Sequence, residues 1–187
     1  MTVWVLRQTL DADEEARIFE RTELRLPFDG LPDLTQVSNA QEARRLLALL
    51  HPDEPPEATA RRVERFWHRF STLQLEDVIA VPLPLSRKLA LATVVGHYRY
   101  ETAADGGDIH LIPVRWHEKF IPLTKFSKHK ELFDPANPPM YEVDSAEARA
   151  SLREQLPHGY NRFAKWKWLM ALFFALSLLR MLQGMVG

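Results

Sequence analysis

The chain contains no cysteine among its 187 residues. This excludes disulfide bonds and thiolate zinc sites, and it fits a reducing compartment. Neither sign of charge dominates, because 24 Lys and Arg residues are balanced by 25 Asp and Glu residues, for a formal net charge of -1. The chain as a whole therefore lacks the strongly basic character of a general DNA-binding protein, and any contact with nucleic acid would come from a local surface.

Several signatures of processing and catalysis are missing as well. The N-terminus has no basic region followed by a long apolar run, so we expect no secretory signal and a body that stays in the cytoplasm. No Glu-x-Lys or Gln-x-Lys occurs, which argues against a restriction-type nuclease that would hold its metal ion with such a motif. No Ser lies in a Gly-flanked elbow, and the His residues lack metal-site spacing. The sequence predicts a protein that is not an enzyme, without cofactor or metal.

Hydrophobic periodicity predicts both strands and helices. Apolar alternation indicates strands at 2–7, 78–82, 88–100 and 110–116, and the first of them is apolar on both faces, as a central strand would be. Apolar residues at helical spacing indicate helices at 39–50, with Ser38 as the cap, and at 57–72 and 145–156. We therefore expect an α+β fold, in which a curled β-barrel carries flanking helices.

Composition divides the chain into three parts. The barrel with its helices is expected to occupy residues 1–133, followed by a Pro-rich linker and a helix at 134–160. Residues 161–187 form the third part, an expected C-terminal hydrophobic helix. The last twenty residues would make a helix of about 30 Å, which is just long enough to span a bilayer.

The hydrophobic tail admits three interpretations. A membrane-spanning anchor would keep Arg162, Lys165 and Lys167 on the cytoplasmic side, with Trp166 and Trp168 at the interface. An interfacial helix would lay its apolar side into one leaflet, and a soluble oligomer would bury the tail between chains. The spanning anchor is the leading interpretation, although Arg180 near the centre costs about 2.5–3.5 kcal/mol.

Aromatic residues recur along the predicted strands and suggest a ligand-binding mouth. The expected ligand-binding residues share a position on or beside these strands, and they are Trp4, Tyr98, Tyr100, Arg115 and Trp116. Alternation places Tyr98 and Tyr100 on one face of their strand. Aromatic rings of this kind stack on a nucleobase, and Arg115 could pair with a phosphate. The alternative is that the rings are barrel core, which is the preferred interpretation for Trp4 alone.

Several motifs, taken in order, resemble one known family. They are Val3-Trp-Val-Leu-Arg, Leu31-Pro-Asp-Leu-Thr, Phe66-Trp-His-Arg-Phe ahead of Asp77-Val-Ile-Ala-Val-Pro-Leu, Gly96-His-Tyr-Arg-Tyr and His110-Leu-Ile-Pro-Val-Arg-Trp. Over residues 1–126 the chain resembles the PUA-like, EVE-related N-terminal domain of Mrr-type restriction-system proteins, without their nuclease domain. Glu76 stands where that family usually has Gly. The resemblance implies a module that holds a flipped, often modified base in an aromatic pocket.

Together these observations predict a membrane-tethered binding protein that recognises a nucleotide or a modified nucleobase. The tail would hold its body at the cytoplasmic face of a bacterial inner membrane, and the resemblance to restriction systems suggests a role in anti-phage defence. The expected partners are a nucleotide or modified nucleic acid, the membrane, and further copies of the chain. The alternative is a soluble homo-oligomeric scaffold, in which the apolar tail is an assembly helix.

Overall fold

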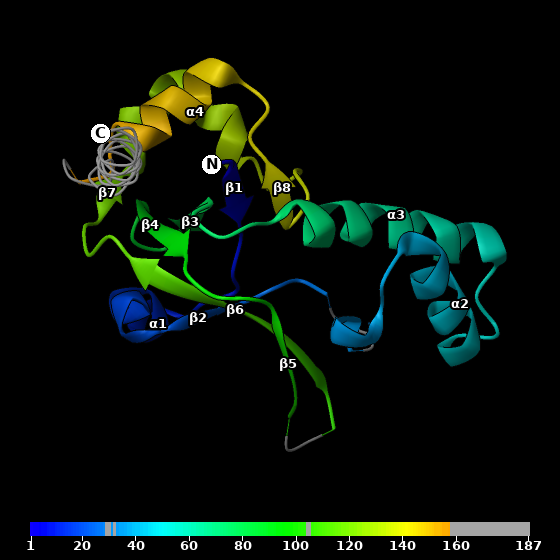
Figure 1. Ribbon diagram of the computed structural model, residues 1–187. Coiled ribbons are helices and arrows are strands. Elements are labelled where there is room, and N and C mark those ends of the chain that lie inside the picture. Colours follow the sequence, from blue (N-terminus) through cyan, green and yellow to red (C-terminus); the bar gives the residue numbers. More distant parts are fainter. Residues whose placement is uncertain (29–30, 32, 104–105, 158–187) are drawn as a thin grey trace, which may run out of the picture. The chain divides into compact units, whose positions relative to one another are not determined.

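The computed structural model describes residues 1–28, 31, 33–103 and 106–157. Residues Met1–Arg153 form one compact unit around a curled, mixed β-sheet with helices beside it (Figure 1). The predicted α+β class and the curled sheet with flanking helices are confirmed. The hydrophobic helix expected at 161–187 lies outside the described residues. Within the described residues, no helix has the length and apolar character needed to cross a membrane.

The sheet is built from strands of two to nine residues. Their bounds are Val3–Leu6 (β1), Glu23–Arg25 (β2), Val78–Leu83 (β3), Lys88–Val94 (β4), Arg99–Thr102 (β5), Asp108–Trp116 (β6), Ile121–Pro122 (β7) and Met140–Glu142 (β8). The strand order is β2-β6-β4-β3-β1-β8, while β5 pairs with β6 and β7 pairs with β4. β1 runs parallel to β3, and the other pairings are antiparallel. β1 is therefore paired on both edges, as its two apolar faces predict.

The helices expected at 39–50, 57–72 and 145–156 are present, and their bounds differ from the expected ones by at most three residues. They are Ala12–Ala16 (α1), Ala40–Leu50 (α2), Pro56–Thr72 (α3) and Ala146–Arg153 (α4), with 3-10 turns at Ile18–Glu20 (η1), Leu34–Gln36 (η2) and Leu123–Phe133 (η3). The cap of α2 is Asn39 and not Ser38, because the Asn39 side chain accepts from the Glu42 backbone N–H at 2.9 Å. The Ser38 backbone N–H instead donates to the Glu42 carboxylate at 2.8 Å. Both contacts satisfy backbone donors at the helix start.

Both faces of the central strands are buried. One face, which carries Trp4, Ile79 and Ile112, belongs to the main hydrophobic core, and α2 and α3 contribute Leu47 and Val63 to the same cluster. The opposite face is buried as well, through residues such as Val3, Val5 and Leu91. η3 and α4 each bury apolar side chains of their own, namely Phe126, Leu132, Ala148 and Leu152. The central part of the sheet is therefore the middle layer of the unit, and its strands β1, β3 and β4 are buried on both sides.

The turn that leads into β3 holds a strained residue. Glu76 has a φ of 70°, in the left-handed region that favours glycine. Its backbone N–H donates to the Val94 carbonyl oxygen at 2.9 Å, which fixes the turn against β4. The structure thus gives a physical reason why Gly would suit this position better than Glu.

Replacing Glu76 with Gly is expected to raise the free energy of unfolding by about 1 kcal/mol, because Gly adopts this conformation without the steric cost of a Cβ. Urea unfolding followed by circular dichroism measures the change. Glu76→Ala is the matched control, since Ala removes the same carboxylate but keeps the Cβ, and it should bring no such gain. Equal stability of the Gly and Ala variants would show that the turn is not strained.

Candidate functional site

Two of the expected ligand-binding residues, Trp4 and Trp116, are enclosed in the core. Trp4 on β1 is fully buried, and its indole Nε1 donates to Asp77 Oδ2 at 3.2 Å. Trp116 at the end of β6 is 8% exposed, and its Nε1 donates to the Arg21 carbonyl oxygen at 2.6 Å. The ring of Phe19 packs against Trp116 with a centroid distance of 5.9 Å. Both indoles therefore pack against and donate to the protein itself.

Arg115 lies on the opposite face of β6 from Trp116. Neighbouring side chains alternate along a strand, and here Arg115 is exposed while Trp116 is buried. Across the sheet Arg115 pairs with Thr93, whose hydroxyl lies 2.8 Å from His117 Nε2. Burial lowers the pKa of the His117 imidazole, and the Arg115 charge lowers it further. The structure does not bring Arg115 onto the face that carries the aromatic rings.

The two tyrosines are brought together around His110. Tyr100 on β5 lies directly across from His110 on β6, with ring centroids 5.6 Å apart. The Tyr98 ring stacks on the same imidazole with a centroid distance of 5.8 Å. Tyr100 is held at its other end by its hydroxyl, which donates to Asp108 Oδ1 at 2.5 Å. Of the five expected residues, these two form a cluster.

A bulge between β4 and β5 positions Tyr98. The single strand expected at 88–100 is interrupted, so that β4 and β5 pair with different parts of β6. Val94 lies opposite Val114 and Arg99 lies opposite Leu111, so five residue steps on one side match three on the other. The two extra residues push the 95–98 segment out of the ladder. Bulges of this kind reorient side chains and are common beside functional sites.

Gly96 allows the bulge to lie close to β6. A Cβ at this position would come within 2.8 Å of Pro113 Cβ and Cγ, which is closer than carbon atoms pack. The Val95 backbone N–H donates to the Pro113 carbonyl oxygen at 3.0 Å and anchors the other side of the bulge. The Gly-His-Tyr sequence therefore has a structural reason, since only Gly fits against Pro113 without a shift.

The bulge forms one wall of a cavity of about 580 Å³, here called the tyrosine cavity. Its other walls come from the η2 region, the segment after α3, and β6. Most of its lining is apolar and consists of Leu26, Leu34, Val37, Leu73, Leu75, Val94 and Ile112. The remaining lining residues are Thr35, Gln74, Gly96, His97 and Tyr98. No Asp, Glu, Lys or Arg is among the described lining residues, so the cavity suits an uncharged group.

Polar groups that lack partners lie at the rim of the tyrosine cavity. The side chains of Gln74 and His97 are exposed and make no hydrogen bond to any group of the described residues. Leu75 beside them is 48% exposed and adds apolar surface at the rim. An apolar cavity with a few available polar groups is the general form of a small-molecule site.

A hydrogen-bond chain fixes the Tyr98 ring in the cavity wall. The Leu34 backbone N–H donates to the Tyr98 hydroxyl at 3.3 Å, and that hydroxyl lies 2.7 Å from His110 Nδ1. His110 Nε2 lies 3.0 Å from the Leu31 carbonyl oxygen, which can only accept. These contacts fit an imidazole that donates a hydrogen bond from Nε2 to Leu31 and accepts a hydrogen bond from the Tyr98 hydroxyl at Nδ1, as the neutral ring does. Burial is the main cause that raises the pKa of Tyr98 to about 12.

His110 was not among the expected site residues, although its position carries a signal. It is 1% exposed and lies in register with the inward-facing Ile112 and Val114 of β6. A histidine on an apolar, inward face needs partners for its ring nitrogens, and a nearby tyrosine is a suitable one. Gln74 carries no such signal, because its place in the cavity depends on how the segment after α3 meets the bulge.

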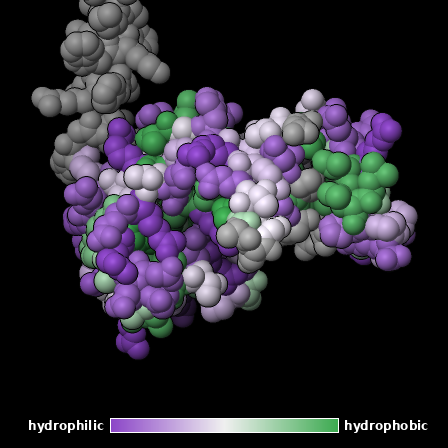
Figure 2. Space-filling view, turned by 90° about the horizontal axis from the view of Figure 1, so that it is seen from below, coloured by the Kyte–Doolittle hydropathy of each residue, from purple (hydrophilic) through white to green (hydrophobic). Residues whose placement is uncertain are grey.

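Exposed leucines form a second surface feature, apart from the tyrosine cavity. Leu49 and Leu50 at the end of α2 are 71% and 52% exposed. Figure 2 shows hydrophobic side chains gathered over the end of the α2–α3 pair. Neither leucine lines the tyrosine cavity.

Comparisons with known proteins do not assign the chain to a family. No protein-family model, curated protein or solved structure matches it. Among the described residues, no three His, Asp or Glu side chains are grouped so that they could hold a metal ion. The case for a function therefore depends on the geometry of the tyrosine cavity.

Proposed function

We propose that the tyrosine cavity binds the ring of a nucleotide or a modified nucleobase, and that the chain acts as a binding protein rather than an enzyme. The observation that carries the proposal is the combination of an apolar cavity, the fixed ring of Tyr98, and the available side chains of Gln74 and His97. A nucleobase has flat apolar faces and a polar edge. Its faces would contact the apolar lining, while its edge would reach the amide and the imidazole at the rim.

The fixed position of the Tyr98 ring supports the proposal that the cavity binds a ligand. The Leu34 and His110 contacts hold the ring before any ligand arrives, so little side-chain entropy is lost on binding. The site of the proposal differs from the one expected from the sequence, because of the five expected residues only Tyr98 lines the cavity, while Trp4, Tyr100, Arg115 and Trp116 do not. The curled sheet with flanking helices is compatible with the PUA-like fold that the motif order implies, and we retain that relationship as part of the proposal.

The membrane tether and the role in anti-phage defence remain predictions from the sequence. The tether concerns residues 161–187, which lie outside the described residues. Defence is an inference from the resembling family. Neither is needed for the cavity to bind a base.

A calorimetric titration tests the proposal. The probes are the four common nucleoside 5′-monophosphates and their base-methylated counterparts, each titrated into the 187-residue chain. At least one probe is expected to bind, and Gln74→Ala and His97→Ala should each weaken that binding by about 1–2 kcal/mol through the loss of a polar contact or of stacking. Both residues are exposed, so neither variant should unfold the protein.

Matched controls come from α2 and α3. Gln41 and His68 are exposed like Gln74 and His97, but they do not line the cavity. Gln41→Ala and His68→Ala should therefore bind the probe as the unchanged protein does. The proposal fails if no probe binds, or if the rim variants and the controls have the same affinity.

A further inference from the structure

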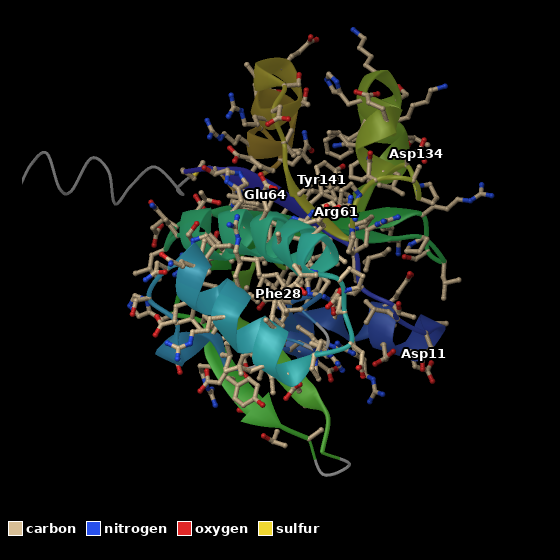
Figure 3. The ribbon with its side chains drawn as sticks, turned by 90° about the vertical axis from the view of Figure 1, so that its right-hand side faces the viewer. Asp11, Phe28, Arg61, Glu64, Asp134 and Tyr141 are labelled. Atoms are coloured by element: carbon tan, nitrogen blue, oxygen red, sulfur yellow. The ribbon has the colours of Figure 1, made fainter. Side chains whose placement is uncertain are left out.

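The C-terminal half of α2 presents an apolar surface that no described element covers. Leu46, Leu49 and Leu50 are spaced three and four residues apart, so they lie along one side of the helix. Leu49 is 71% exposed and Leu50 is 52% exposed, while Leu46 is half-buried. Figure 3 looks onto the α2–α3 pair, which lies in front of the rest of the described chain. We call these three residues the leucine surface.

The leucine surface is a gathered group of apolar side chains. Single apolar side chains on a protein surface are ordinary, whereas a contiguous group with a polar rim marks an interaction surface. Figure 2 shows such a group over the end of the α2–α3 pair, with hydrophilic side chains around it. The core does not require Leu49 or Leu50, because Ala43 and Leu47 are the residues that α2 buries there. The two exposed leucines are therefore available to a partner.

Opposite charges lie before and after the leucine surface. Arg45 precedes Leu49 by four residues, so it lies on the same side of α2, one turn earlier. Glu57 lies in the first turn of α3, beyond the C-terminal end of α2. Both side chains are exposed, and neither forms an ion pair or a hydrogen bond within the described residues. Glu42, a further turn before Arg45, is occupied at the helix start, where its carboxylate accepts from the Ser38 backbone N–H.

This order of charges is self-complementary under a two-fold rotation. When two copies of α2 pack antiparallel with their leucine surfaces in contact, the rotation brings the basic end of each copy to the acidic end of the other. Arg45 then meets the partner's Glu57, twice in the assembly. A parallel arrangement would instead place like charges together, which is unfavourable. The charges therefore fit a second copy of this chain in the antiparallel orientation.

We propose that the leucine surface is an interface through which the chain forms a homodimer, with two antiparallel copies of α2 at its centre. The leucines form the apolar centre of the interface, and the two pairs of Arg45 with the partner's Glu57 form its polar rim. The proposal does not depend on the tyrosine cavity, because neither Leu49 nor Leu50 lines it. It also does not depend on residues 161–187, which the sequence suggested as an assembly segment.

Cross-linking through a single introduced cysteine tests the dimer. The chain has no cysteine of its own, so any disulfide comes from the introduced residue. Leu49→Cys in the 187-residue chain is expected to give a cross-linked dimer under mild oxidation with copper phenanthroline, because the two-fold axis passes near this residue and brings the two thiols together. Non-reducing gel electrophoresis measures the rate at which the dimer forms.

Leu85→Cys provides the matched control. Leu85 is 63% exposed, so its accessibility is similar, but it lies in the turn between β3 and β4. It should cross-link much more slowly than Leu49→Cys. Association through another part of the chain would give Leu49→Cys no advantage over this control.

Further changes in the Leu49→Cys protein test the contacts themselves. Leu50→Asp should slow cross-linking about tenfold, because the interface would have to bury an unpaired charge. Arg45→Glu and Glu57→Arg should each slow it through like-charge contact, and the two changes together should restore it, because the exchanged pair again has opposite charges. The proposal is overturned if Leu49→Cys cross-links no faster than Leu85→Cys, if Leu50→Asp leaves the rate unchanged, or if the double charge exchange fails to restore it.

Discussion

Replacing Asp77 with Ala is expected to lower the free energy of unfolding by about 3–5 kcal/mol. Asp77 is 3% exposed, and its carboxylate accepts three hydrogen bonds from different parts of the chain. Oδ1 accepts from the Thr2 backbone N–H at 2.6 Å, and Oδ2 accepts from Trp4 Nε1 at 3.2 Å and from the Gln74 backbone N–H at 3.0 Å. The Ala variant leaves all three donors without their acceptor, which is the reason for the large loss.

Urea unfolding followed by circular dichroism measures this loss, and two further variants provide the comparison. Asp77→Asn keeps the size of the side chain but turns one acceptor into a donor, so it should lower the stability by an intermediate amount. Asp53 is exposed and has no hydrogen bond in the described part of the chain, so Asp53→Ala should change the stability by less than about 0.5 kcal/mol. An Asp77→Ala variant as stable as Asp53→Ala would show that the three contacts contribute nothing.

The Asp77 contacts show why the sequence predicts some parts of the fold and does not predict others. The strand at 78–82 and the helix at 57–72 lie within about one residue of β3 and α3, because long apolar stripes determine both elements. The contact between Asp77 and Trp4 joins residues 73 positions apart. Periodicity describes one element at a time, so it cannot predict which carboxylate meets which indole.

Short strands are the main elements that the sequence did not predict. β2, β7 and β8 have two or three residues each, which is too few for alternation to be recognised. β8 follows a Pro-rich stretch that was expected to be a linker, and it pairs with β1. A partner strand determines such elements, since an exposed edge of β1 can pair with almost any extended segment that reaches it.

The candidate site shows the same division between local and long-range information. Alternation predicted that Tyr98 and Tyr100 share a face, and both contact His110. It could not predict the bulge at 95–98, because the two extra residues are defined only by the register with β6. Aromatic residues are also chemically alike in a core and in a binding site, so residue type alone did not separate Trp116 from Tyr98.

Trp116→Ala separates these two roles. The variant is expected to lower the free energy of unfolding by about 3–5 kcal/mol, the cost typical of removing a buried Trp side chain. The variant removes the contact with Phe19 and leaves the Arg21 carbonyl oxygen without its donor. Trp116→Phe should cost less, because the smaller ring still fills most of the space and only the N–H contact is lost outright.

A thermal melt of each variant, run beside the nucleotide titration, decides between core and ligand contact. Leu85 is 63% exposed, and Leu85→Ala serves as the control for removing an apolar side chain without opening a cavity. If Trp116 is core, the Trp116 variants should lose stability in the order Ala, then Phe, while Leu85→Ala melts like the unchanged protein. If instead Trp116→Ala melts normally and binds the nucleotide more weakly, Trp116 contacts the ligand, and the binding site must extend beyond the tyrosine cavity to the Arg21 side of the sheet.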